Sequence, residues 1–112
     1  PGRTEASVMN QKLLDQVAQR MAKYPIYSQE KAADVGEHVV VMRLFNAFGA
    51  GTWYLTEYDP IDKRAFGYVT GLGGDEWGYI SVQELAEFKK HGLYPIEIDR
   101  HFESKKFKEL KV

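Results

Sequence analysis

The sequence of 112 residues contains no cysteine, which excludes disulfide bridges, thiolate metal sites and a cysteine nucleophile. It has no run of about 20 apolar residues, so no membrane-spanning helix is predicted. Neither sign of charge is in excess, because 15 basic residues stand against 16 acidic ones. This balance argues against nucleic acid as the main partner and against mimicry of DNA by an acidic surface. A cytoplasmic location fits the lack of cysteine.

The chain is too short to build two hydrophobic cores, so one domain is expected. Its first methionine is Met9, and no charged-then-apolar leader opens the sequence. We therefore interpret residues 1–9 as a tag or disordered leader and residues 10–112 as a single α+β domain. The hydrophobic fraction of 44% is ordinary for a globular protein.

The first predicted helix covers residues 10–23. Its apolar residues recur at every fourth position, at Leu13, Val17 and Met21, which gives one apolar stripe along the helix. Pro25 follows, and the residue before a proline avoids the helical conformation, so the helix should end there.

The second predicted helix covers residues 82–91. Ser81 and Glu84 have the spacing of a capping box, in which each side chain can bond the backbone amide of the other residue. Gly92 comes after the last turn, as is typical of a helix C-terminus. His91 would then lie in that last turn, where the helix dipole favours its protonated form.

Four segments rich in β-branched and aromatic residues predict strands. They are residues 38–48, 51–59, 64–71 and 76–80. Short turns join these strands, so an antiparallel arrangement is expected. Residues 94–99 should add an edge strand, because Pro95 suits an edge. The predicted fold class is α+β: an antiparallel β-meander of about four strands packed by an N-terminal helix and a second helix at about 82–91.

Glu57 is an acid within an otherwise apolar strand. A four-residue turn at 60–63 would pair Glu57 with Phe66 and Leu55 with Tyr68. Side-chain alternation then puts these residues on the apolar face that packs against the helices, with Glu57 at its margin. A slip of one residue would move Glu57 to the other face. Two interpretations stay open: a structural acid bonded to backbone amides, a Tyr hydroxyl or an Arg, and a carboxylate that faces a ligand.

None of the three histidines has a spacing typical of a zinc site, so no metal and no cofactor is predicted. Asp99, Arg100 and His101 place an acid, a cation and a titratable base next to one another. Glu57 and His101 are therefore the candidate catalytic residues, as an acid and a base for proton transfer.

The central and late parts of the chain contain five short sequence blocks. They are YPIYSQE (24–30), LFNAFGAGTWYLTEYDP (44–60), AFGYVTG (65–71), EWGYISVQEL (76–85) and IEIDRHFE (96–103). Together these blocks resemble the bacterial domain of unknown function 2958 family. The sequence departs from it at Asn46, Ala47 and Phe48, where the family often has a proline.

The resemblance implies an α+β protein of the bacterial cytoplasm, often encoded on a mobile element, with no established activity. It also implies a set of candidate ligand-binding residues. They are Tyr54, Glu57, Asp59, Tyr79 and Arg100.

Three functions are consistent with the sequence. The favoured one is a non-catalytic protein- or ligand-binding module, which meets a protein partner or a second copy through exposed aromatic residues. The first alternative is a small hydrolase-like or metal-assisted enzyme that uses Glu57 and His101. The second is a nucleic-acid accessory protein with a basic C-terminal tail. The basic residues of that tail are Lys105, Lys106, Lys108 and Lys111.

Overall fold

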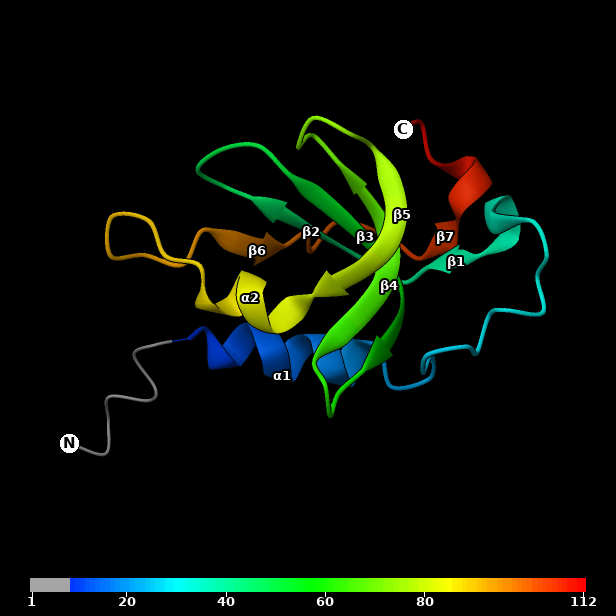
Figure 1. Cartoon of the computed structure of the whole chain (residues 1–112), viewed down its shortest axis with the longest axis horizontal. Coiled ribbons are helices and arrows are strands. Elements are labelled where there is room, and N and C mark those ends of the chain that lie inside the picture. Colours follow the sequence, from blue (N-terminus) through cyan, green and yellow to red (C-terminus); the bar gives the residue numbers. More distant parts are fainter. Residues whose placement is uncertain (1–8) are drawn as a thin grey trace.

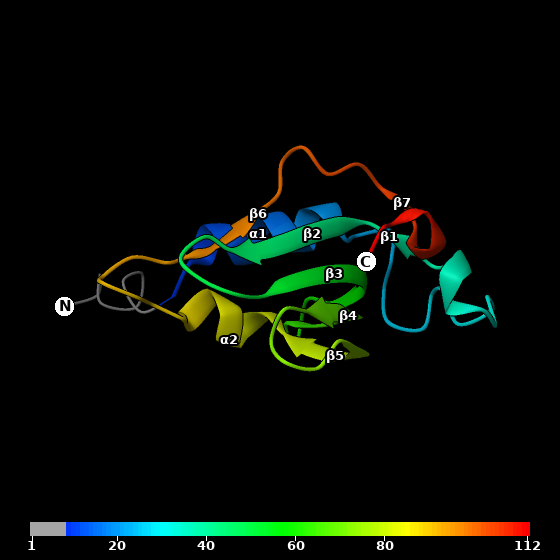
Figure 2. The same ribbon diagram turned by 90° about the horizontal axis from the view of Figure 1, so that it is seen from above.

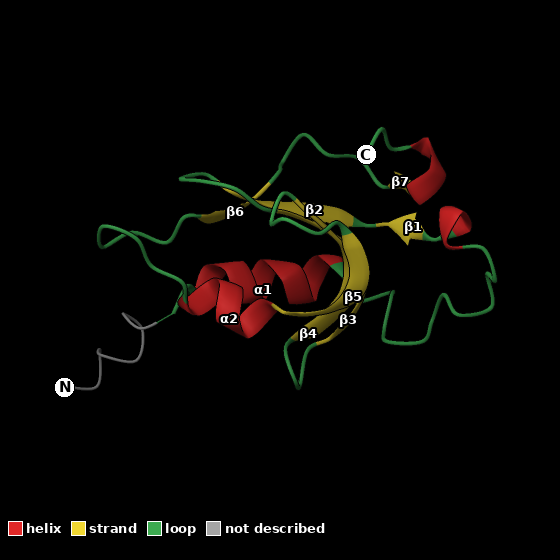
Figure 3. Ribbon diagram, turned by 45° about the horizontal axis from the view of Figure 1, so that its top comes forward, coloured by secondary structure: helices red, strands yellow, loops and turns green. Residues whose placement is uncertain are grey.

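The computed structural model describes residues 9–112, so the leader expected at residues 1–9 lies almost wholly outside the described part. A five-stranded antiparallel sheet has the strand order β5-β4-β3-β2-β6 (Figure 1). Its strands are β2 (Met42–Asn46), β3 (Thr52–Asp59), β4 (Arg64–Thr70), β5 (Glu76–Ser81) and β6 (Ile96–Ile98). Helices α1 (Gln11–Arg20) and α2 (Val82–Glu87) lie side by side against one face of this sheet (Figure 3). The predicted α+β fold class is confirmed.

A second, two-stranded sheet pairs β1 (Val39–Val40) with β7 (Lys105–Lys106). It lies at the end of the molecule away from α2, together with the short helices η2 (Val35–Glu37) and η3 (Phe107–Glu109) (Figure 2). The predicted strand 38–48 is thus two strands. They separate at Val41, whose amide donates to the carbonyl of Leu55 at 2.9 Å.

Helix α1 begins where the sequence predicts, because the Asn10 side chain accepts a hydrogen bond from the Leu13 amide at 3.1 Å. Its apolar stripe is buried, with Leu13, Leu14 and Val17 in the core. The helix ends at Arg20, three residues before the predicted end. Neither helix among residues 9–112 has the length and apolar character needed to cross a bilayer.

Helix α2 also begins as predicted, with the Ser81 hydroxyl accepting from the Glu84 amide at 3.1 Å. The prediction that it extends to His91 is wrong, because it ends at Glu87. Lys90 and Leu93 exchange two backbone hydrogen bonds of 2.8 and 3.0 Å around His91 and Gly92. Both central residues have positive φ, 54° and 77°, which is the geometry of a tight type I′ turn rather than a helix end. His91 is therefore a turn residue.

Strand β3 contains a β-bulge that the sequence did not reveal. Glu57 pairs with Phe66 as expected, but Leu55 pairs with Gly67 instead of Tyr68, so Thr56 is an extra residue in β3. Its hydroxyl donates to the Phe66 carbonyl at 3.0 Å. Because one extra residue reverses the faces of a strand, the side chains before and after Thr56 exchange sides.

The bulge overturns the predicted environment of Glu57. Before it, Trp53 and Leu55 point to the helices, and after it Tyr58 does so instead. Glu57, Phe66 and Tyr68 therefore lie on the face away from the helices, not on the core face. In the first hairpin, Met42 pairs with Leu55, and both side chains lie in the core.

The sheet face away from the helices carries a cluster of rings, which we call the aromatic face. Its members are Phe66, Tyr68, Trp77 and Tyr79 from the sheet and Phe107 from η3. Phe66 stacks on Trp77 with centroids 5.8 Å apart, and Phe107 meets Trp77 at 4.7 Å and Tyr68 at 4.9 Å. The C-terminal segment thus packs on the sheet through Phe107.

The bulge gives a test of the fold at Gly67. A β-carbon at this position would overlap the carbonyl oxygen of Tyr54, so Gly67→Ala should lower the free energy of unfolding by more than about 3 kcal/mol. Gly78 is the paired residue on β5 and has open space around it, so Gly78→Ala should change stability by no more than about 0.5 kcal/mol. Urea denaturation of both variants measures the difference, and equal stability would contradict the bulge.

Candidate functional site

The carboxylate of Glu57 is 5% exposed and anchors a loop from the N-terminal part of the chain. One oxygen accepts from the Tyr27 amide at 3.1 Å, and the other accepts from the Gln29 amide at 2.8 Å. These bonds match the interpretation of a structural acid bonded to backbone amides.

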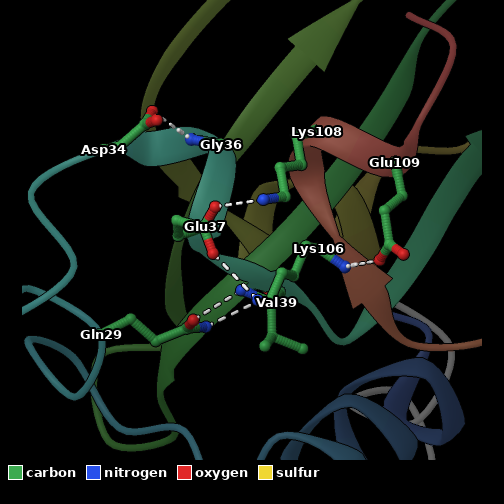
Figure 4. A network of polar contacts seen from close by, with 8 residues as sticks. All are labelled: Gln29, Asp34, Gly36, Glu37, Val39, Lys106, Lys108 and Glu109. Atoms are coloured by element: carbon green, nitrogen blue, oxygen red, sulfur yellow. Dashed lines mark hydrogen bonds and ion pairs between the residues drawn. The ribbon is translucent and has the colours of Figure 1, made fainter.

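The Gln29 side chain completes this anchor by behaving as an extra peptide group. Its amide oxygen accepts from the Val39 amide at 2.6 Å, and its nitrogen donates to the Val39 carbonyl at 2.9 Å (Figure 4). The same nitrogen donates to the Thr56 carbonyl at 2.8 Å. Tyr24 contributes in the same way, since its carbonyl accepts from the Tyr58 amide at 2.9 Å. The loop therefore provides hydrogen-bond partners for the backbone of β3 at Thr56 and Tyr58, beyond the part of the strand that pairs with β2.

Tyr27 is the residue that this anchor presents to solvent. It has φ of 74°, a conformation that a bulky side chain rarely adopts, and it is 66% exposed. Its hydroxyl forms a hydrogen bond with Tyr79 that raises the pKa of Tyr79 above its ordinary value, and the negative charge of Glu57 acts in the same direction. The two tyrosines form a bridge from the loop to β5.

A groove of about 310 Å³ lies between this loop and the aromatic face, and we call it the Glu57 groove. Aromatic walls, two acids and a histidine line it, together with small apolar side chains of the loop. The polar and aromatic members are Tyr27, Glu30, His38, Glu57, Phe66 and Tyr79. Of the described residues, no lysine and no arginine line the groove, so its lining is acidic.

His38 is buried in the wall of this groove, with only 7% of its surface exposed. Its Nε2 lies 2.9 Å from the Ala32 carbonyl, and its Nδ1 has no hydrogen-bond partner within the part of the chain that the structure describes. Since a nitrogen that faces a carbonyl must donate, Nδ1 is an acceptor in the neutral ring. Sequence reasoning did not single out Tyr27, Gln29 or His38, because no local pattern marks them.

The other predicted site residues lie elsewhere. Asp59 accepts from the amides of Ile61 and Asp62 at 2.9 and 3.3 Å, so it shapes the β3–β4 turn. Tyr54 is buried, and its ring packs edge-on against Phe102 at 6.3 Å. Tyr54 and Asp59 line no part of the Glu57 groove.

The structure does not bring Glu57 and His101 together. Asp99 to Phe102 form a turn, closed by the Phe102 amide and the Asp99 carbonyl at 3.3 Å. His101 is exposed there, and Arg100 lines a hollow beside α1. Asp99 instead forms an ion pair with Arg43 at 2.6 Å. Among residues 9–112, no three acidic or histidine side chains are arranged to hold a metal ion.

Two lysines of the basic tail are engaged within the molecule. Lys106 forms an ion pair with Glu37 at 2.9 Å, and Lys108 pairs with the other oxygen of the same carboxylate (Figure 4). These bonds lower the pKa of Glu37 to about 2, chiefly through Lys108. They hold η3, and with it Phe107, against the rest of the protein.

The comparisons agree with the resemblance seen in the sequence. The family model for "Protein of unknown function (DUF2958)" matches residues 9–108. No curated protein and no solved structure matches the chain. The matched range includes the Glu57 groove, the bulge and the whole sheet.

Removal of the Glu57 carboxylate should destabilise the fold. Glu57→Ala leaves the Tyr27 and Gln29 amides without acceptors, which should lower the free energy of unfolding by about 2–4 kcal/mol in urea denaturation. Glu57→Gln keeps one acceptor oxygen, so its loss should be smaller. Glu30→Ala is the matched control, because it removes an exposed acid of the same groove. If Glu57→Ala were as stable as Glu30→Ala, the anchoring role would be excluded.

The Glu37 ion pairs predict a pH dependence. Because the pKa of Glu37 is lowered from 4.5 to about 2, its contribution to stability is present above about 4.5 and is lost as pH falls toward about 2. The difference in melting temperature between wild type and Glu37→Gln should therefore shrink over this range. Trp77 fluorescence, measured in a Trp53→Phe background, reports whether Phe107 leaves the sheet. A difference that stays constant with pH would contradict this assignment.

Proposed function

The chain belongs to the DUF2958 family of proteins of unknown function, and we propose that it is a non-catalytic module that binds an extended segment of a protein partner along β5. One observation carries the proposal: within residues 9–112, β5 is the end strand of the sheet, and no other strand pairs with its outer edge. Proteins that recognise extended segments use such an edge, because the incoming segment adds a strand through main-chain hydrogen bonds.

The register fixes which groups face the free edge. The Val82 amide donates to the Lys63 carbonyl at 2.9 Å, which makes these two residues a hydrogen-bonded pair of the ladder between β4 and β5. Hydrogen-bonded and non-bonded pairs alternate in an antiparallel ladder, so Trp77 and Tyr79 belong to non-bonded pairs. Their amides and carbonyls therefore point away from β4. Within residues 9–112, no turn, loop or cap forms a backbone hydrogen bond with Trp77 or Tyr79.

The two edges of the sheet differ in how they are protected. The other edge is β6, which has three residues, follows Pro95 and carries the exposed Glu97. Short edges with proline or charge resist further pairing. Strand β5 has six residues and no proline or lysine, and the exposed Tyr79 lies at its centre. Of the two, β5 is the edge suited to accept another strand.

Charge favours a basic segment as the occupant. Residues 57–87 contain seven acids against Lys63 and Arg64. Four of these acids immediately precede, begin or closely follow β5. They are Asp75, Glu76, Glu84 and Glu87. A second copy of the chain would bring the same acidic edge against itself, whereas a basic segment would be complementary.

We propose that the protein acts in the bacterial cytoplasm and that a mobile element encodes it, as the family resemblance implies. The two alternative functions gain no support from the geometry. His101 does not line the Glu57 groove, and two of the four tail lysines are already paired with Glu37.

Two variants at Tyr79 test strand addition. Peptides would first be selected on the whole protein from a random display library. Tyr79→Val removes the ring but keeps the outward amide, whereas Tyr79→Pro removes both and is tolerated at an edge. The selected basic peptides should bind Tyr79→Pro at least about tenfold more weakly than Tyr79→Val, which corresponds to about 1.4 kcal/mol.

Amide hydrogen exchange provides the second readout. Bound peptide should slow exchange at Trp77 and Tyr79 and leave Gly78 unchanged, because the Gly78 amide already bonds β4. Equal affinity of the two variants, or failure of the library to enrich any peptide, would refute the proposal. Concentration-dependent dimerisation through β5 would assign the edge to a second copy instead.

A further inference from the structure

We propose that the Glu57 groove is a binding site for an organic cation, a guanidinium or alkylammonium group such as the side chain of an arginine or lysine. The site uses the side chains of the groove and not the free backbone of β5, so it goes beyond strand addition. Charge, ring geometry and an unpaired acceptor each support it.

The charge of the groove selects a cation. Glu57 lies at its base, 5% exposed, and Glu30 lies at its exposed margin. No lysine or arginine lines it. Arg64 lies beside the ring of Tyr79, but it lines the neighbouring hollow with Asp59 and forms an ion pair with Asp62 at 3.6 Å. The two acids of the groove are therefore not neutralised by a basic side chain of the lining.

The walls have the chemistry that organic cations prefer. Tyr27, Phe66 and Tyr79 offer ring surfaces around the groove, and a cation within about 6 Å of a ring centroid is attracted to its face. The protein already uses this attraction at the same wall, because the Arg64 guanidinium lies 5.5 Å from the centroid of Tyr79. The rings therefore suit a second cation that enters from the side of Glu57.

His38 adds an acceptor that lacks a donor. Its side chain is more than nine-tenths buried in the wall of the groove, and Nδ1 has no partner among residues 9–112. A buried polar atom without a partner is uncommon and calls for a missing group. An N–H group of a guanidinium or ammonium ion is a donor of the kind that this atom lacks, whereas an ionised carboxylate is not.

The anchored loop explains how the site keeps its shape. Glu57 and Gln29 fix the loop to β3, and this fixes Tyr27, with its positive φ, opposite Tyr79. The groove is therefore formed before a ligand arrives, and little conformational entropy is lost on binding.

Titration with N-acetyl-arginine amide, followed by NMR, tests the site. The expected dissociation constant is roughly millimolar for so small a ligand. N-acetyl-citrulline amide has the same shape without the charge and should bind at least tenfold more weakly. The largest chemical-shift changes should occur at Tyr27, His38 and Tyr79. Added salt should weaken binding, because it screens the attraction between the charges.

Exposed residues of the groove provide variants that should still fold. Glu30→Gln should weaken binding of the arginine probe about threefold, and Tyr79→Leu at least tenfold. Glu103→Gln removes an exposed acid outside the groove and should leave affinity unchanged. Equal binding of the citrulline probe, or equal affinity of Glu30→Gln, Tyr79→Leu and Glu103→Gln, would overturn the proposal.

The outcome is separable from that of strand addition. The arginine probe should not slow amide exchange at Trp77, because it adds no strand to β5. A protein that binds the probe but enriches no peptide would keep the cation site and lose the proposed function. A protein that binds peptides at β5 equally well with arginine or citrulline would lose only the cation site.

Discussion

The extra residue in β3 is the constraint on which the site depends. Thr56 has no partner across the ladder, and the strand continues with its faces exchanged. The exchange places the Tyr58 ring in the core and Glu57 on the aromatic face. It also requires close approach of two backbones, which only glycine at position 67 allows. Without the bulge, alternation would turn the Glu57 carboxylate toward the helices.

The loop from residue 24 to residue 38 acts as a substitute for a strand. It has no ladder of its own, yet the Tyr24 carbonyl, the Gln29 side chain and the amides bound by Glu57 satisfy the polar groups beside β3. A true strand would have buried its alternate side chains against the sheet. The loop instead leaves room above Phe66, and this room is the Glu57 groove. Acid, loop and groove are thus consequences of one arrangement.

Local patterns in the sequence predicted most of the elements. The four-residue repeat of α1, the Ser81 cap of α2 and the Gly and Pro turns between strands are each set by neighbouring residues. The bulge was not predictable, because its signal is a contact between Tyr54 and Gly67 across two strands. Alternation alone therefore gave Glu57 the wrong face.

The site was predictable only in part for the same reason. Glu57 and Tyr79 stand out in the sequence, one as an acid among apolar residues and the other through the family resemblance. Tyr27 and Gln29 become relevant through bonds to residues about 30 positions away. Arg100 and His101 do not line the Glu57 groove, because the segment turns at Asp99, where the ion pair with Arg43 fixes the chain.

The exchange of faces within β3 has a consequence for how the length of the chain can vary. Loss or gain of one residue between Trp53 and Tyr58 would swap a core ring for a carboxylate, so this strand should tolerate no insertions or deletions. The glycine-rich link between β4 and β5 is exposed, and two of its glycines have free space around them. Differences in length among related chains should therefore gather in that link and be absent from β3.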